Sequence, residues 1–98
     1  MTLRYAIIGS GMMGQEHIRN IALLDDARVT AIAEPDAAMR DLSLALAPDA
    51  AAYDDWRALL AAEAPDAFVI GSPNFTHAEI LEELVPLGRP ILCEKPLV

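Results

Sequence analysis

Short apolar runs alternate with longer amphipathic stretches along this chain, and the alternation restricts the possible folds more than any other feature of the sequence. The apolar runs are bounded by glycine, proline or charged residues, as buried strands are, and the stretches between them repeat apolar residues at helical spacing. The predicted strands cover residues 4–9, 28–34, 50–53, 67–71 and 89–93. The predicted helices cover residues 12–24, 37 to about 47, 55–64, and 76 to about 86.

This order of elements predicts an α/β fold, a doubly wound parallel sheet of the Rossmann type with helices on both faces and right-handed crossovers. The expected strand order is 3-2-1-4-5. Asp36 and Asp54 are the expected caps of the second and third helices, and Thr76 with Glu79 shows a capping box at the fourth. Residues 1–98 suffice for one domain. Because such sheets usually continue with a further helix and strand, we expect the fold to be incomplete at its C-terminal end.

Three glycines follow the first predicted strand and open the first predicted helix. Gly9, Gly11 and Gly14 match the pattern G-x-G-x-x-G in the context that a dinucleotide-binding loop requires. The first glycine permits the tight turn, the second lets a pyrophosphate approach the backbone, and the third lets the helix pack closely. The N–H groups of Met12 and Met13 would then face the phosphates. A tight turn without a ligand is the alternative.

An acidic residue ends the second predicted strand. Glu34 lies about 20 residues after the last glycine, where an acid that binds ribose hydroxyls belongs. A solvated charge at a strand end is the alternative. Because a carboxylate repels a 2′-phosphate, and Pro35 and Asp36 follow rather than arginine, the sequence favours NAD over NADP. Arg40 could still reach this site from the following helix.

Polar groups follow the fourth strand, at the edge of a parallel sheet that lines a ligand crevice. Ser72, Pro73 and Asn74 form a turn there, and the Asn74 amide offers both donors and an acceptor. His77 lies in the first turn of the next helix. Turn formation, helix capping by Thr76 and a solvated histidine would explain the same residues without a ligand.

A lysine follows the fifth strand at the same edge. Glu94, Lys95 and Pro96 come directly after the apolar run, where a solvated loop could begin later. Beside a nicotinamide, the Lys95 ammonium could hold a substrate hydroxyl and assist proton transfer. A surface lysine paired with Glu94 is the alternative.

The stretch from Tyr5 to Leu97 resembles the N-terminal domain of the Gfo/Idh/MocA oxidoreductases. Four motifs in the family's order carry the resemblance: Gly9-Ser10-Gly11-Met12-Met13-Gly14, Ala33-Glu34-Pro35-Asp36, Ser72-Pro73-Asn74-Phe75-Thr76-His77, and Cys93-Glu94-Lys95-Pro96-Leu97. The resemblance implies an NAD(P)-binding domain of an enzyme that transfers hydride between the nicotinamide and a hydroxyl-bearing substrate such as a sugar or polyol.

The resemblance also assigns roles to individual residues. The pyrophosphate would be surrounded by Gly9, Gly11, Met12, Met13 and Gly14. Glu34 would hold the adenosine ribose. The cofactor cleft would be lined by Ser72, Pro73, Asn74 and His77. Glu94 and Lys95 would lie by the nicotinamide, with Lys95 as the catalytic residue that contacts substrate, and the Lys95–Pro96 bond is often cis in the family.

Family members carry a second α/β domain that binds substrate and supplies a histidine usually paired with an aspartate. We therefore expect the substrate domain to be absent from these residues and the chain alone to be inactive. A possible homo-oligomer is implied for the full-length enzyme. The alternatives are a non-catalytic dinucleotide-binding module or a truncated gene product. A methyltransferase that uses S-adenosylmethionine also has a glycine loop and a ribose-binding acid, but the match at Glu94-Lys95-Pro96 argues against it.

Composition excludes several partners. The net charge of −8 and the pI of about 4.4 make the chain a poor ligand for nucleic acid, and no lysine-rich face would attract a membrane. Its one cysteine, Cys93, cannot form an internal disulfide, so we expect a reducing compartment, the cytoplasm. Residues 5–14 are apolar, but three glycines interrupt them, which argues against a signal peptide. No metal site is predicted.

Overall fold

Within the described residues, the strands and helices occur where the alternation predicts them, and their observed ends differ from the prediction by at most two residues. A computed structural model describes residues 3–9, 12–71 and 80–93, and for residues 12–14 and 92–93 it describes the backbone alone. The elements are β1 (Leu3–Ile8), α1 (Met12–Ala22), β2 (Ala27–Ala33), α2 (Ala37–Leu46), β3 (Ala51–Tyr53), α3 (Trp56–Ala62), β4 (Ala67–Ile70), a 3-10 helix (Val85–Leu87) and β5 (Ile91–Cys93). Residues 80–84 are also helical.

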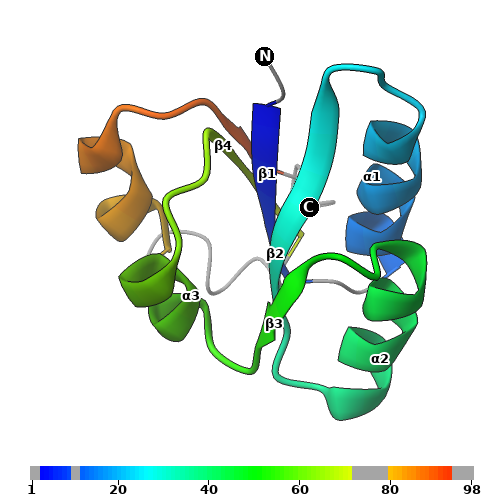
Figure 1. Ribbon diagram of the computed structural model, residues 1–98. Coiled ribbons are helices and arrows are strands. Elements are labelled where there is room, and N and C mark those ends of the chain that lie inside the picture. The colour runs from blue at the N-terminus through cyan, green and yellow to red at the C-terminus, as the bar shows by residue number, and fades with distance from the viewer. Residues whose placement is uncertain (1–2, 10–11, 72–79, 94–98) are drawn as a thin grey trace, which may run out of the picture.

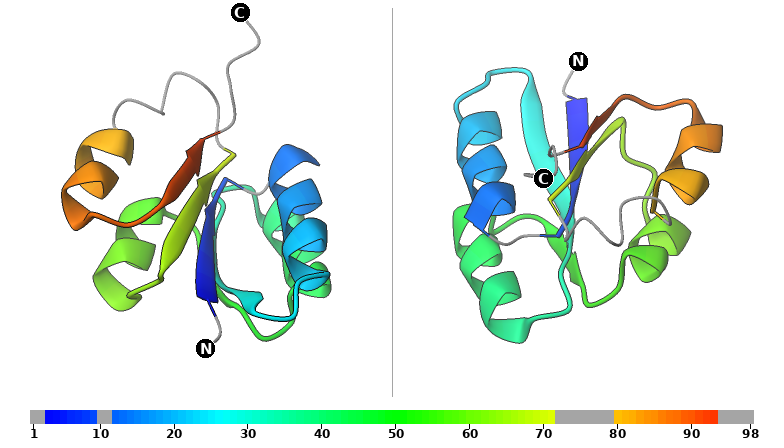
Figure 2. Two further views of the ribbon diagram at one scale, coloured as in Figure 1. Left: turned by 90° about the horizontal axis from the view of Figure 1, so that it is seen from above. Right: turned by 180° about the vertical axis from the view of Figure 1, so that it is seen from behind.

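The strands form a parallel sheet in the order β3-β2-β1-β4-β5, which confirms the predicted order. Figure 1 shows α1 and α2 on one face of the sheet and α3 with the helical residues 80–84 on the other, and Figure 2 shows the same three layers from two further directions. β2 and then β3 lie on one side of β1 in the sheet, and β4 and then β5 lie on its other side. A doubly wound sheet binds its ligand where the strand order reverses, which is here at the carboxyl ends of β1 and β4.

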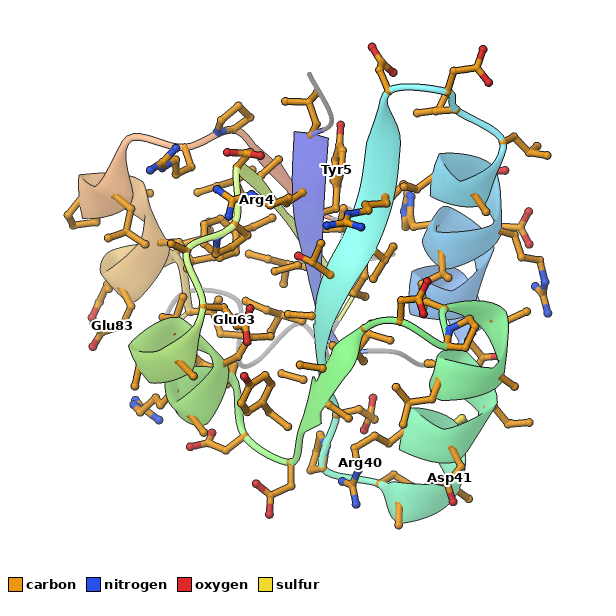
Figure 3. The ribbon with its side chains drawn as sticks, in the orientation of Figure 1. Arg4, Tyr5, Arg40, Asp41, Glu63 and Glu83 are labelled. Carbon is orange, nitrogen blue, oxygen red and sulfur yellow. The ribbon has the colours of Figure 1, made fainter. Side chains whose placement is uncertain are left out.

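At the amino edge of the sheet, the carboxylate of Asp66 contacts residues from two other segments of the chain. Asp66 accepts hydrogen bonds from the Arg4 backbone N–H at 2.9 Å, from Nε at 3.2 Å and from Nη2 at 3.3 Å, and Arg89 Nη1 lies 3.9 Å away. The hydrogen bonds from Arg4 hold the pKa of Asp66 below its usual range. Figure 3 shows Arg4 at the end of β1 remote from Arg40. Asp66, Arg4 and Arg89 thus connect the residues that precede β4 and β5 to the start of β1.

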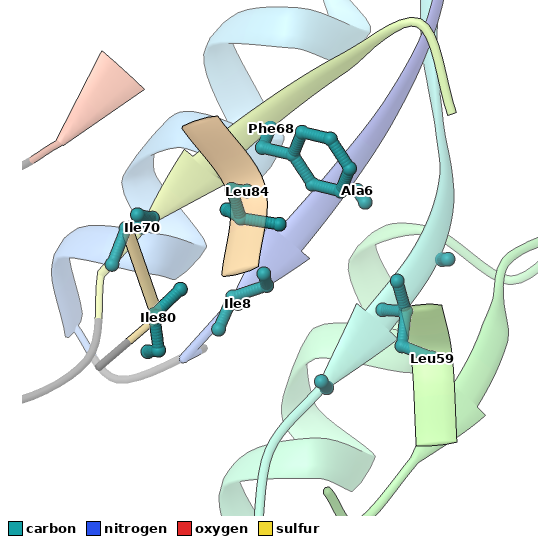
Figure 4. Close-up of a cluster of buried hydrophobic side chains, with 9 residues drawn as sticks. Ala6, Ile8, Leu59, Phe68, Ile70, Ile80 and Leu84 are labelled. Carbon is teal, nitrogen blue, oxygen red and sulfur yellow. The ribbon is translucent and has the colours of Figure 1, made fainter. Parts of the chain in front are cut away.

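The three central strands are buried on both faces, and their side chains divide between two apolar clusters. Toward α3 and residues 80–84, the buried members are Ala6, Ile8, Ala31, Ala33, Leu59, Phe68, Ile70, Ile80 and Leu84 (Figure 4). Toward α1 and α2, they are Ile7, Ile18, Ile21, Ala27, Val29, Ile32 and Val69. The first cluster combines the large ring of Phe68 with three alanines, and this mixture of sizes lets the layers interlock. Burial on both faces explains why the strands are continuous apolar runs in the sequence.

β2 contains an irregularity that shifts its register against β1. Tyr5 pairs with Val29, but the next residue, Ala6, pairs with Ala31, so Thr30 is an extra residue on β2. A bulge of this kind changes which side chains share a face. Val29 packs toward α1 and α2, whereas Ala31, two residues later, packs on the opposite face.

The start of α3 corrects one prediction. Asp54 is the predicted cap of a helix from residue 55, but α3 begins at Trp56, and Asp55 occupies the cap position without a side-chain capping bond. Packing explains the difference. Trp56 packs against the buried cluster beneath α3, and Leu59 is a fully buried member of that cluster. Contact with the sheet, rather than a cap, therefore decides where this helix begins.

The other helix ends follow the prediction where the structure describes them. Asp36 caps α2, because its carboxylate accepts the N–H of Met39 at 3.0 Å. The helical residues 80–84 run into the 3-10 helix, which ends at Gly88 with a φ of +68°. The predicted capping box at Thr76 lies outside the described residues.

Candidate functional site

Gly9 makes the turn that leaves β1 at the carboxyl edge of the sheet. Its φ is +85°, a left-handed conformation that glycine adopts without the steric cost that a side chain brings. Its N–H donates to the carbonyl oxygen of Ala33 at the end of β2, at 2.8 Å. Gly71, just after β4, donates to the Ile8 carbonyl oxygen at 2.7 Å. The start of the glycine loop is thus held between the ends of the two strands that flank β1.

Glu34 follows β2 directly and is 9% exposed. Its backbone N–H donates to the Tyr53 carbonyl oxygen at 2.9 Å, and its carboxylate oxygen Oε2 accepts the N–H of Asp36 at 3.0 Å. Pro35 has no N–H, so Asp36 carries the first backbone donor after Glu34. Because Gly9 is bonded to the residue before Glu34, the acid and the glycine turn lie on neighbouring strands at one edge of the sheet.

Arg40 completes the turn between β2 and α2. Its guanidinium Nη1 donates to the Glu34 carbonyl oxygen at 2.7 Å. Its backbone N–H donates to the Asp36 carbonyl oxygen at 2.9 Å, in the first turn of α2. Figure 3 shows Arg40 by the start of α2. The sequence predicts only that Arg40 could reach this region, because a bond between residues six positions apart depends on the path of the turn between them.

The hydroxyl of Tyr53 is hydrogen-bonded to a residue outside the candidate site. Tyr53 ends β3 and packs against the cluster beneath α3, and its hydroxyl donates to Glu63 Oε2. This hydrogen bond raises the pKa of the Tyr53 phenol. The backbone carbonyl of Tyr53 supports Glu34, but its hydroxyl is engaged by the residue that follows α3. No sequence motif marks Tyr53.

The structure describes only part of the predicted site. Gly9 and Glu34 lie at the ends of neighbouring strands, and Met12, Met13 and Gly14 form the first turn of the α1 backbone. The Lys95–Pro96 bond lies outside the described residues. So do the remaining predicted site residues, which are Gly11, Ser72, Pro73, Asn74, His77, Glu94 and Lys95. The strands that precede them end level with one another, since Ile8 pairs with Ile70, and Ile70 with Cys93.

Two further observations concern the described residues alone. In them, no three acidic, histidine or cysteine side chains are grouped so that they could hold a metal ion. Within the same ranges, no helix has the length and apolar character that crossing a membrane requires.

The strand order, the left-handed glycine that leads from β1 toward α1, and the buried acid after β2 together define a dinucleotide-binding Rossmann domain. Comparison with known proteins gives the family. The profile of the Gfo/Idh/MocA proteins, described as an oxidoreductase family with an NAD-binding Rossmann fold, matches residues 3–98. The chain belongs to this family.

Curated relatives agree with the family match. Inositol 2-dehydrogenase of Burkholderia multivorans is 40% identical over 99 residues, and that of Corynebacterium glutamicum is 40% identical over 97 residues. These alignments cover 99% and 98% of this chain, but 29% of each relative. The chain therefore spans less than a third of the length of these enzymes.

Solved structures show the same fold. The crystal structure of a myo-inositol dehydrogenase from Corynebacterium glutamicum has a TM-score of 0.89 at 35% identity, over 99% of this chain and 29% of that one. The myo-inositol dehydrogenase of Lactobacillus casei, crystallised with NAD(H) and myo-inositol, has a TM-score of 0.87 at 28% identity, over 100% of this chain and 30% of that one.

Proposed function

We propose that the chain is the cofactor-binding part of a dehydrogenase that oxidises a CH–OH group of a polyol, with inositols as the favoured substrate class. Family membership supports the NAD-binding role, and the relatives named inositol dehydrogenases support the substrate class. The observation that carries the proposal is the buried Glu34 beside the Gly9 turn. When bound, NAD supplies the hydride acceptor at C4 of the nicotinamide.

The residues at the carboxyl edge fit the adenosine half of NAD. Glu34 is held by its backbone and by one carboxylate oxygen, so its side chain has a defined place at the end of β2. A carboxylate accepts hydrogen bonds from the ribose 2′- and 3′-hydroxyls and repels a 2′-phosphate. We therefore propose NAD, rather than NADP, as the cofactor.

The remaining assignments rest on the family resemblance. The pyrophosphate would contact Gly9, Gly11, Met12, Met13 and Gly14. The cleft would be lined by Ser72, Pro73, Asn74 and His77. Glu94 and Lys95 would lie by the nicotinamide, and the Lys95 ammonium would hold the substrate hydroxyl and take part in moving its proton.

The setting of the enzyme follows from composition and from the family. The net charge of −8 disfavours nucleic acid and anionic membranes as partners. One cysteine and a nicotinamide cofactor are compatible with the cytoplasm. The full-length enzyme would act on a small sugar or polyol and would assemble as a homo-oligomer.

The test is to measure binding of NAD and NADP to the chain by isothermal titration calorimetry. The wild-type chain should bind NAD more tightly than NADP. Glu34→Ala should weaken NAD binding about tenfold, or about 1.4 kcal/mol, and should narrow the gap to NADP. Glu83→Ala is the matched control, because Glu83 is exposed and lies in the helical residues 80–84. Equal affinities of the wild-type chain for the two cofactors would contradict the proposal.

A further inference from the structure

Hydrogen bonds from β3 and from the β2–α2 turn hold Glu34 at the end of β2. Its backbone N–H donates to the Tyr53 carbonyl oxygen, its carboxylate accepts the Asp36 N–H, and its carbonyl oxygen accepts Arg40 Nη1. The first two bonds use backbone groups of Tyr53 and Asp36, which almost any sequence would supply. The third uses a side chain, and it is the shortest of the three at 2.7 Å. Arg40 is therefore a tether of Glu34 that a substitution can remove.

We propose that Arg40 is a positioning residue for dinucleotide selection, acting through Glu34. By holding the Glu34 carbonyl, the guanidinium fixes the backbone from which the ribose-binding carboxylate projects. This inference rests on the proposed function, because it concerns the same ribose site. Arg40 does not contact the cofactor; its effect on binding passes through the carboxylate of Glu34.

The geometry supports a positioning role for Arg40. The bond runs from the first turn of α2 back to the end of β2, and Arg40 is half-buried. Asp36 also stabilises this turn, because its carboxylate accepts the Met39 N–H at 3.0 Å. A charged donor to a carbonyl oxygen forms a stronger hydrogen bond than a neutral one. The arginine thus stabilises one conformation of the segment that carries Glu34.

A double-mutant cycle separates this role from a direct contact. Arg40→Met keeps the aliphatic stem and removes the donors. It should weaken NAD binding roughly three- to tenfold, because only part of the free energy of this charged hydrogen bond is passed on to cofactor binding. In a Glu34→Ala background the same change should alter NAD affinity less than twofold, because the carboxylate that Arg40 positions is gone. Arg40→Lys should recover part of the loss, and Arg28→Ala, an exposed arginine at the start of β2, should have no effect.

Calorimetry with NAD and NADP gives the readout, and thermal melting followed by circular dichroism verifies that each variant is folded. If Arg40→Met does not fold, Arg40→Lys takes its place in the cycle. NADP affinity should stay the same or rise in the Arg40 variants, because Glu34 opposes the 2′-phosphate. A purely structural role would weaken both cofactors equally and would overturn the proposal.

Two other results would overturn it. An unchanged loss of NAD affinity in the Glu34→Ala background would show that Arg40 touches the cofactor itself. Weaker NADP binding in the Arg40 variants would make the guanidinium a phosphate ligand. The proposed function fails separately, if the wild-type chain does not bind NAD or if Glu34→Ala leaves its NAD affinity intact. If Glu34→Ala weakens NAD and Arg40→Met does not, only the inference about Arg40 is wrong.

Discussion

Two glycines with positive φ lie at opposite edges of the sheet, and they allow backbone strain to be separated from cofactor binding. Gly9 has a φ of +85° at the carboxyl edge, and Gly88 has a φ of +68° shortly before β5, at the amino edge. A Cβ at Gly88 would meet no atom within 4 Å. Gly88→Ala therefore tests the backbone cost alone. Gly9→Ala carries the same cost and also perturbs the turn that begins the proposed pyrophosphate loop.

The same backbone cost is expected in the two variants. A side chain in the left-handed region costs about 1–2 kcal/mol. Alanine also restricts the unfolded chain, which returns about 0.4–1 kcal/mol. The free energy of unfolding should therefore fall by about 1 kcal/mol in Gly88→Ala, equivalent to roughly 4–8 °C in Tm for a domain of this size. It should fall by at least as much in Gly9→Ala, because Gly9 is buried and its N–H is bonded to Ala33.

Cofactor affinity should distinguish the two variants. Relief of the strain at residue 9 would move the turn, break the 2.8 Å bond to Ala33 and displace the start of α1. We expect Gly9→Ala to weaken NAD binding at least tenfold, about 1.4 kcal/mol, and Gly88→Ala to leave it unchanged. Urea denaturation gives the stabilities and calorimetry gives the affinities. Wild-type stability in Gly88→Ala, or equal NAD affinity in the two variants, would refute the reasoning.

Three further predictions concern the core, the amino edge and activity. Leu59→Ala should lower the free energy of unfolding by about 2–5 kcal/mol, since Leu59 is fully buried, whereas Leu42→Ala at an exposed site should change it by less than about 0.5 kcal/mol; urea denaturation measures both. Because its pKa is lowered in the folded state, Asp66 stabilises the fold fully at neutral pH and loses that effect as the pH falls below about 4. Thermal melts should accordingly show Asp66→Asn less stable than wild type at pH 7, with the difference shrinking at pH 3; a constant difference would contradict this. The 98-residue chain alone should form no NADH from myo-inositol, because it spans 29% of the relatives that carry that name, and clear turnover in an absorbance assay would disprove this.

The strands, their order and the acid at the end of β2 could be predicted because each depends on a local pattern. Continuous apolar runs follow from burial on both faces, and Glu34 lies at a fixed distance from the glycine loop. The bulge at Thr30 could not be predicted, because it depends on how β2 aligns with β1. The start of α3 depends on the packing of Trp56, and the bond from Arg40 on the path of a turn. These features require the assembled sheet.

The amino and carboxyl edges of the sheet are held by separate sets of bonds, with Asp66 at one and Glu34 at the other. The contacts of Asp66 are with Arg4 and Arg89 at the amino edge, whereas Asp36 and Arg40 contact Glu34 at the carboxyl edge. Under the proposed role of Glu34, evolution can therefore alter thermal stability at Asp66 without changing coenzyme preference. A protein engineer can use the same independence, by strengthening the amino edge first and then accepting destabilising changes around Glu34 in a search for altered coenzyme selectivity.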